Sequence, residues 1–219
     1  MNESRRACLR FAGLAGTGLL ATAAEPAAAT DCLALFAKRQ SVRSYKPDPV
    51  PDDHLRRILD AARRAPTSGN QQPWKFLVIR DRAKIDRMKA SCLARVEPRL
   101  KELPAAERDS RRADIQHRMD GYFSAPVYVV VLTDSQSTYP SYNHHDGPLA
   151  AGYLMLAARA LGYGTVYITD AIPDEVTREV LAIPARYERV CITPIGIPAA
   201  WPDPVPKKKL EDLVAYETL

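Results

Sequence analysis

Two arginines and a serine alternate near residue 40 of the chain, at Arg39, Ser41 and Arg43. Along an extended segment, alternate side chains point the same way, so two guanidinium groups and a hydroxyl would share one side. Guanidinium groups bind anionic oxygen acceptors through paired hydrogen bonds. The motif therefore predicts a site for an anionic ligand that carries planar acceptors. An exposed basic loop is the alternative interpretation.

A second cluster of hydrogen-bonding residues is the run Ala65-Pro-Thr-Ser-Gly-Asn-Gln-Gln-Pro-Trp74. Its small and polar residues are typical of a turn between a helix and a strand. Its hydroxyl and amide side chains offer both donors and acceptors, which suits the edge of a heterocycle. We interpret the run as a ligand-binding loop, and turn chemistry alone is the alternative.

The order and spacing of these two motifs resemble the signature of the nitroreductase family. Arg-x-Ser-x-Arg is followed by a predicted amphipathic helix and then by Ala-Pro-Thr-Ser-x-Asn-x-Gln-Pro-Trp. The similarity continues through Asp146-Gly147, the apolar run of residues 154–165, the segment 194–198 and the tail 207–214. It covers essentially all of the chain after the first 29 residues.

This resemblance implies an FMN-dependent oxidoreductase that forms a homodimer, with FMN at the subunit interface. The residues that it implies for FMN binding are Arg39, Gln40, Ser41, Arg43, Pro66, Thr67, Ser68, Asn70, Gly164, Thr165, Lys207 and Lys209.

Each group of residues has an implied role. Arg39 and Ser41 would hold the phosphate and ribityl end with one or more tail lysines. Arg43 would lie near the pyrimidine edge of the flavin, where a cation stabilises negative charge on the ring. The loop residues 66–70 would come from the other subunit. The Gly164-Thr165 pair would lie beside the ring, where small residues permit close approach.

The implied reaction is ping-pong electron transfer from a reduced donor to a nitroaromatic, quinone or related small organic acceptor. No catalytic acid or base is assigned, because the flavin carries the hard chemistry. One alternative is a specialised family member, such as a reductive dehalogenase, an azoline-type dehydrogenase or a dimethylbenzimidazole synthase. Another is an exported flavin-binding or electron-carrier protein without turnover of its own. The sequence leaves open whether His144 and His145 supply protons, and whether Tyr142 and Trp201 line a substrate pocket or only pack.

The first residues of the chain indicate export. Ser4-Arg5-Arg6 precedes a mildly apolar stretch at residues 11–24, and Ala27-Ala28-Ala29 is a small-residue cleavage signature. This order is typical of a bacterial signal peptide, and the stretch is too short and too weakly apolar for a comfortable membrane span. The paired arginines resemble a twin-arginine signal, and a general secretory signal with two chance arginines is the alternative.

We therefore expect a removable signal peptide at residues 1–29 and a nitroreductase-like FMN-binding domain at residues 30–219. The expected location is periplasmic or otherwise exported, and cytoplasmic if the signal does not function. NAD(P)H is the usual donor that the resemblance implies. NAD(P)H is scarce outside the inner membrane, so a periplasmic or membrane redox partner is the second candidate.

Apolar runs and turn residues predict the secondary structure. Strands are expected at residues 74–79, 126–133, 164–169 and 190–197. Helices are expected at residues 33–39, from residue 52 to near 66, from 83 to 122 with breaks near Pro98 and Pro104, at 148–161 and at 174–181. The long helical block between the first two strands favours an α+β fold. The resemblance gives that fold a central mixed or antiparallel sheet flanked by helices.

Composition argues against several other classes of protein. The formal net charge is +5, yet the basic residues are interleaved with acidic ones rather than gathered in one stripe. We therefore expect no nucleic-acid partner, and no stable membrane insertion of the mature chain. The cysteines at positions 8, 32, 92 and 191 show no metal-type spacing, so neither a metal site nor a disulfide framework is expected.

Overall fold

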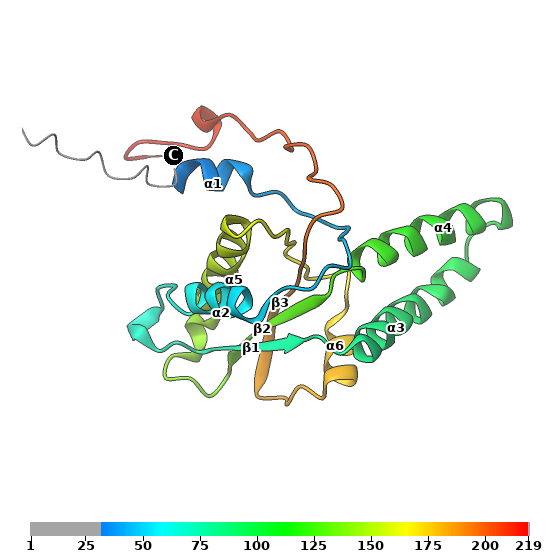
Figure 1. Cartoon of the computed structure of the whole chain (residues 1–219), viewed down its shortest axis with the longest axis horizontal. Coiled ribbons are helices and arrows are strands. Elements are labelled where there is room, and N and C mark those ends of the chain that lie inside the picture. Colours follow the sequence, from blue (N-terminus) through cyan, green and yellow to red (C-terminus); the bar gives the residue numbers. More distant parts are fainter. Residues whose placement is uncertain (1–31, 219) are drawn as a thin grey trace, which may run out of the picture. The chain divides into compact units, whose positions relative to one another are not determined.

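The computed structural model describes residues 32–218. The expected signal segment lies outside the described residues. Within them, one antiparallel sheet has the strand order β1-β2-β3 (Figure 1). The strands are β1 (Trp74–Ile79), β2 (Val127–Asp134) and β3 (Tyr187–Ile195). The predicted α+β class with helices around an antiparallel sheet is confirmed.

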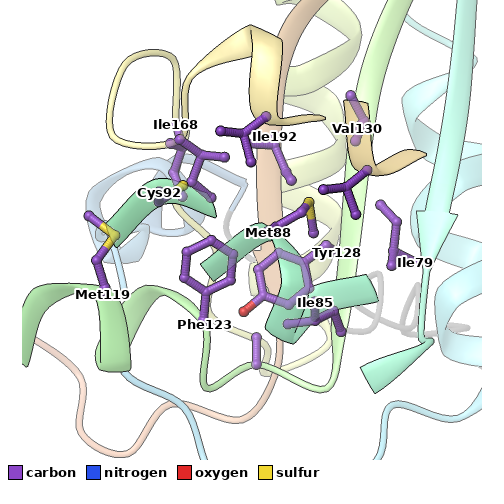
Figure 2. Packing of buried hydrophobic residues seen from close by; sticks show 14 of the residues in the cluster. Ile79, Ile85, Met88, Cys92, Met119, Phe123, Tyr128, Val130, Ile168 and Ile192 are labelled. Carbon is purple, nitrogen blue, oxygen red and sulfur yellow. The ribbon is translucent and has the colours of Figure 1, made fainter. Parts of the chain in front are cut away.

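The central strand β2 is buried on both of its faces. Because side chains alternate along a strand, its apolar run divides between two hydrophobic cores. One core receives Tyr128, Val130 and Leu132, and part of it is drawn in Figure 2. The other core receives Val127, Val129 and Val131. The two cores place a layer of helices on each face of the sheet.

Helices α2 (Asp52–Ala62) and α5 (Asn143–Ala160) cover one face of the sheet. Helices α3 (Arg82–Lys101), α4 (Ala105–Tyr122) and α6 (Asp174–Leu181) cover the other. Helix α1 (Cys32–Lys38) leads into the first motif. Three short 3-10 helices complete the described elements: η1 (Ser68–Asn70), η2 (Pro140–Tyr142) and η3 (Leu210–Asp212).

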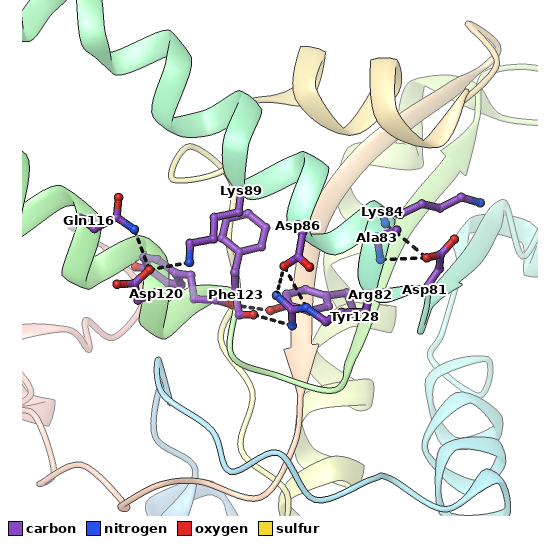
Figure 3. A network of polar contacts seen from close by, with 11 residues as sticks. Asp81, Arg82, Ala83, Lys84, Asp86, Lys89, Gln116, Asp120, Phe123 and Tyr128 are labelled. Atoms are coloured by element: carbon purple, nitrogen blue, oxygen red, sulfur yellow. Dashed lines mark hydrogen bonds and ion pairs between the residues drawn. The ribbon is translucent and has the colours of Figure 1, made fainter.

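Polar contacts link helices α3 and α4 at their surface. Lys89 Nζ lies 2.5 Å from a carboxylate oxygen of Asp120, and Arg112 Nη2 donates to Glu97 Oε1 at 2.7 Å. At the base of the pair, Arg82 Nη1 donates to the Phe123 carbonyl at 3.0 Å, as Figure 3 shows. Exposed ion pairs each stabilise by only about 0–1 kcal/mol. We infer that these contacts mainly fix how the two helices align.

Two prolines lie inside helices, contrary to the sequence predictions. Helix α3 runs through Pro98, and α5 begins before Pro148, so the predicted break and the predicted helix start there are wrong. A proline inside a helix leaves the carbonyl four residues earlier without its usual donor. Those carbonyls belong to Ala94 and His144, which are exposed residues, so water can bond them.

The strand predicted at residues 164–169 does not form as a regular strand. Isolated bridges take its place, and they join Thr165 to Ser41, Gly164 to Gly196 and Ile168 to Ile192. Along the segment, the partner is first the residue after β3, then Ser41 beyond α1, and then β3 itself. Because its partner changes along its length, no continuous ladder is formed.

Candidate functional site

The Arg-x-Ser-x-Arg segment lies beside the Gly164-Thr165 loop. Ser41 pairs with Thr165 in a parallel bridge, and the Val42 N–H donates to the Thr165 carbonyl at 3.0 Å. The Val42 side chain is only 2% exposed, whereas Ser41 and Arg43 both line a hollow on the surface. The alternation predicted for this motif is therefore present at Ser41 and Arg43. The fold brings together two motifs that are far apart in the sequence.

The hollow has a volume of about 1000 Å³. Besides the motif, its walls are the last turns of α4 and the segment 199–202. Arg43 Nε donates to the Tyr122 hydroxyl at 3.2 Å, and Arg43 Nη1 donates to the Ser41 carbonyl at 3.3 Å. A Cβ at Gly121 would lie 2.4 Å from the Arg43 carbonyl oxygen. Only glycine lets α4 approach the motif backbone this closely.

Arg39 is half-buried, and its guanidinium has no hydrogen bond or ion pair within residues 32–218. The backbone just before it is held by Arg159, whose Nε donates to the Lys38 carbonyl at 3.0 Å. The Arg159 guanidinium also stacks on Trp201, 3.8 Å from the ring centroid. Trp201 therefore packs on Arg159, and it does not line the hollow. The neighbouring Gln40 donates from Nε2 to the Ala37 carbonyl at 3.3 Å.

The predicted binding loop is anchored by the buried carboxylate of Asp146, which is 2% exposed. This carboxylate accepts hydrogen bonds from the Ser68 N–H at 3.0 Å, from the Ser68 hydroxyl at 3.3 Å and from Gln71 Nε2 at 2.7 Å. Three donors from one short loop thus meet a single acceptor on α5. The N–H, the hydroxyl and the carbonyl of Ser68 are all engaged within the subunit.

The rest of this loop is held by its own side chains. Gln72 donates from its backbone N–H to Thr67 Oγ1 at 3.3 Å and from Nε2 to Asn70 Oδ1 at 3.1 Å. Gly69 and Asn70 take the left-handed backbone conformation, with φ of 56° and 54°. None of residues 66–70, Pro66 included, lines the hollow beside Arg43. The single subunit therefore does not bring the two predicted halves of the site into one cavity.

The tail lysines Lys207 and Lys209 are exposed and precede η3 without regular secondary structure. In the described part of the chain, neither ammonium group makes a hydrogen bond or ion pair. No described contact joins them to Arg39 or Ser41. Their role at the phosphate therefore stays a prediction.

Several other candidate groups make no chemical cluster. His144 and His145 are exposed, with ring centroids 3.8 Å apart. Among the described residues no group of three His, Cys, Asp or Glu could hold a metal ion. Burial raises the pKa of the Cys92 thiol to about 11 and that of the Cys191 thiol to about 12. Both thiols are free and stay protonated near neutral pH.

Sequence reasoning gave no role to three residues that organise the site: Asp146, Tyr122 and Arg159. Asp146 carried a usable signal, because it is an acidic residue at the start of an otherwise apolar helical run. Such a residue in a buried position needs hydrogen-bond donors from elsewhere in the fold. Tyr122 and Arg159 carried no comparable signal, since their partners come from distant segments.

The architecture and the site define the class: an α+β protein whose antiparallel sheet lies between two helical layers, with an extended basic segment beside a Gly-Thr loop. Residues 36–197 match the nitroreductase family model. The chain belongs to the nitroreductase family.

Individual relatives agree with this assignment. The chain is 30% identical over 174 residues to the 5,6-dimethylbenzimidazole synthase of Rhodospirillum rubrum. The aligned region covers 75% of this chain and 81% of that protein. It is 30% identical to an iodotyrosine deiodinase of Thermotoga neapolitana, covering 84% and 96% of the two chains. Among solved structures, a Desulfovibrio desulfuricans protein described as a nitroreductase in complex with FMN is 26% identical, with a TM-score of 0.67 over 86% of this chain and 98% of that one.

Proposed function

We propose that this protein is an FMN-dependent oxidoreductase that takes electrons from a reduced donor and passes them to a small organic acceptor. The observation that carries the proposal is the segment of Arg39, Ser41 and Arg43. Ser41 is bridged to Thr165, and Ser41 and Arg43 face a hollow. Family membership and the FMN-bound relative support the same cofactor.

The residues present fit FMN. The partnerless guanidinium of Arg39 is half-buried, which suits a phosphate that can accept paired hydrogen bonds. Ser41 would help to hold the ribityl end, and Lys207 and Lys209 would add positive charge at the phosphate. Arg43 faces the hollow and would stabilise negative charge at the pyrimidine edge.

When bound, FMN would supply the electron and hydride transfer. The role of the chain is to bind and orient it. Tyr122 accepts a hydrogen bond from Arg43 Nε, so it limits the positions that the Arg43 guanidinium can take. Asp146 similarly fixes the loop that carries Ser68.

The functional form would be a homodimer. Apolar side chains of α5 are exposed in the single subunit, with Leu149 at 43% and Tyr153 at 42%. The tail is also rich in exposed apolar residues, which are Val205, Leu210, Leu213, Val214 and Tyr216. Large exposed apolar surfaces mark sites of protein association, and two-fold dimers are the commonest oligomers. A partner subunit would then supply residues 66–70 to complete each FMN site.

Purification and turnover test the function. The purified protein should be yellow, with one FMN per subunit, and a reduced donor should bleach the flavin absorbance. Nitrofurantoin or menadione should then restore it with multiple turnovers. A colourless protein that binds no added FMN in fluorescence titration would contradict the proposal. Bound FMN that no donor reduces would favour the electron-carrier alternative.

A specialised reaction is the second candidate, and two of the relatives support it. One of them is named a dimethylbenzimidazole synthase and another an iodotyrosine deiodinase. Slow turnover of nitroaromatics by a protein with stoichiometric FMN would favour this candidate. Halogenated aromatics would then test for reductive dehalogenation. Reduced flavin with oxygen would test for flavin cleavage.

We also propose that the chain is exported by the twin-arginine route, on the basis of Ser4-Arg5-Arg6 and Ala27-Ala28-Ala29. In that location the electron donor would be a membrane quinol or a periplasmic redox protein. In the cytoplasm the donor would be NAD(P)H.

A further inference from the structure

A second cavity, of about 560 Å³, lies between α3, α4 and the segment that leads into α6. Its floor is apolar. Cys92, Ile115 and Met119 line it, with exposures of 3%, 8% and 9%. Cys92 and Met119 appear at one edge of the hydrophobic cluster in Figure 2. The cavity therefore offers a hydrophobic surface to a ligand that can enter from the solvent.

Charged side chains surround this apolar floor. Arg95 and Arg99 come from α3 and Arg118 from α4, while Asp170 precedes α6 and Glu175 lies in its first turn. The three guanidinium groups outnumber the two carboxylates, so the lining keeps one positive charge in excess.

Two of the arginines are free to bind a ligand. Arg95 lies 3.8 Å from Glu179, at the limit of an ion pair. Within the described chain the guanidinium groups of Arg99 and Arg118 make no hydrogen bond or ion pair. The exposed pairs elsewhere on α3 and α4 engage Arg82, Lys89 and Arg112 instead. Arg99 and Arg118 therefore line the cavity with guanidinium groups that have no partner among the described residues.

We propose that this cavity binds a small monocarboxylate with an apolar body, such as an aromatic acid. The carboxylate would accept paired hydrogen bonds from Arg99 or Arg118, and the ring would cover the apolar floor. Asp170 and Glu175 would repel a dianion, and the arginines would repel a cation.

The cavity is distinct from the hollow beside Arg43, although the two share Arg118 and Tyr122. Arg99 lines only the cavity. It therefore separates binding here from binding at the proposed flavin site.

Calorimetric titration of the FMN-loaded protein with benzoate tests the proposal. We expect one benzoate per subunit, with weaker binding of benzamide, which has the same shape without the charge, and of benzylamine. Arg99→Gln should weaken benzoate binding about tenfold or more, the scale of a lost charged hydrogen bond. Arg87→Gln is the matched control, because Arg87 is an exposed arginine of α3 outside the cavity lining. The Arg87→Gln variant should bind benzoate with unchanged affinity.

A crystal soaked in 4-bromobenzoate locates the site directly. The proposal expects the anomalous bromine peak in the cavity, near Met119. A bromine over the flavin, together with benzoate binding that is insensitive to Arg99→Gln, would overturn it. Tighter binding of benzylamine than of benzoate, or no benzoate binding at millimolar concentration, would overturn it as well.

Discussion

Substitutions of the two arginines of the first motif should have different effects, because the surroundings of the two residues differ. The Arg39 guanidinium has no partner in the described chain, whereas the Arg43 guanidinium is already held by Tyr122. Arg39→Ala should weaken FMN binding by about 1.5–3 kcal/mol, the scale of a hydrogen bond to a charged group. Arg43→Ala should instead lower the reduction potential of the bound flavin, because it removes a cation beside the ring.

Fluorescence titration measures the first effect and spectroelectrochemistry the second. An unchanged potential in the Arg43 variant would show that Arg43 does not lie near the pyrimidine edge. Arg111→Ala serves as a control, because Arg111 is exposed and lies outside both cavities.

Asp146 is predicted to act on FMN only through the loop that it holds. Asp146→Ala removes the acceptor of three hydrogen bonds, and unpaired buried donors cost about 1–3 kcal/mol. We expect a lower melting temperature and weaker FMN binding, with the flavin potential little changed. Hydrogen exchange should show faster exchange at residues 67–72. Asp114→Ala, at an exposed and unpaired position, should leave all of these unchanged. Wild-type exchange rates in the Asp146 variant would refute the positioning role.

At the scale of elements, hydrophobic pattern predicted most of the fold. Apolar runs and their periodicity predicted the central strand β2, its neighbours β1 and β3, and helix α6. The predictions failed where local rules met tertiary context. Pro98 is tolerated because the carbonyl that it leaves unpaired belongs to an exposed residue. The 164–169 segment pairs with two different partners, which no pattern within it can reveal.

The candidate site was predictable only in part, because the sequence shows local motifs but not tertiary contacts. The types and order of Arg39, Ser41 and Arg43 are visible in the sequence, and the resemblance supplied their roles. What holds them in place was not visible, because Gly121, Tyr122 and Thr165 reach the motif through tertiary packing.

Gly121 gives an element-scale prediction. Any side chain there would collide with the Arg43 carbonyl, so Gly121→Ala should push the end of α4 away from the motif. We expect a loss of stability of about 1–3 kcal/mol, typical of overpacking, together with weaker FMN binding. Chemical denaturation and FMN titration measure the two effects. Ser110→Ala, on an exposed part of α4, is the control and should be nearly neutral. Full stability in the Gly121 variant would mean that the approach is looser than the structure shows.

At the scale of the whole molecule, the exposed α5 residues predict how assembly and cofactor binding are linked. Tyr153→Lys places a charge on the proposed subunit interface and should yield monomers that have lost FMN. Light scattering with simultaneous flavin absorbance measures both properties. Ala90→Lys adds the same charge at an exposed position of α3 and should leave the dimer yellow. A monomer that keeps stoichiometric FMN would contradict the dimeric site.

The location of the protein is the subject of the last prediction, because it decides which electron donor is available. The twin-arginine route carries folded proteins, which suits a cofactor that is made inside the cell and would be lost from an unfolded chain. Full-length protein should therefore be found in the periplasm, cleaved near Ala29 and loaded with FMN. Replacing Arg5 and Arg6 together by Lys should abolish this export while leaving the folded domain intact in the cytoplasm. There the variant should still bind FMN, so a loss of folding can be separated from a loss of transport. Wild-type protein that stays cytoplasmic and uncleaved, with rapid NADPH turnover, would refute the export proposal and make NADPH the donor.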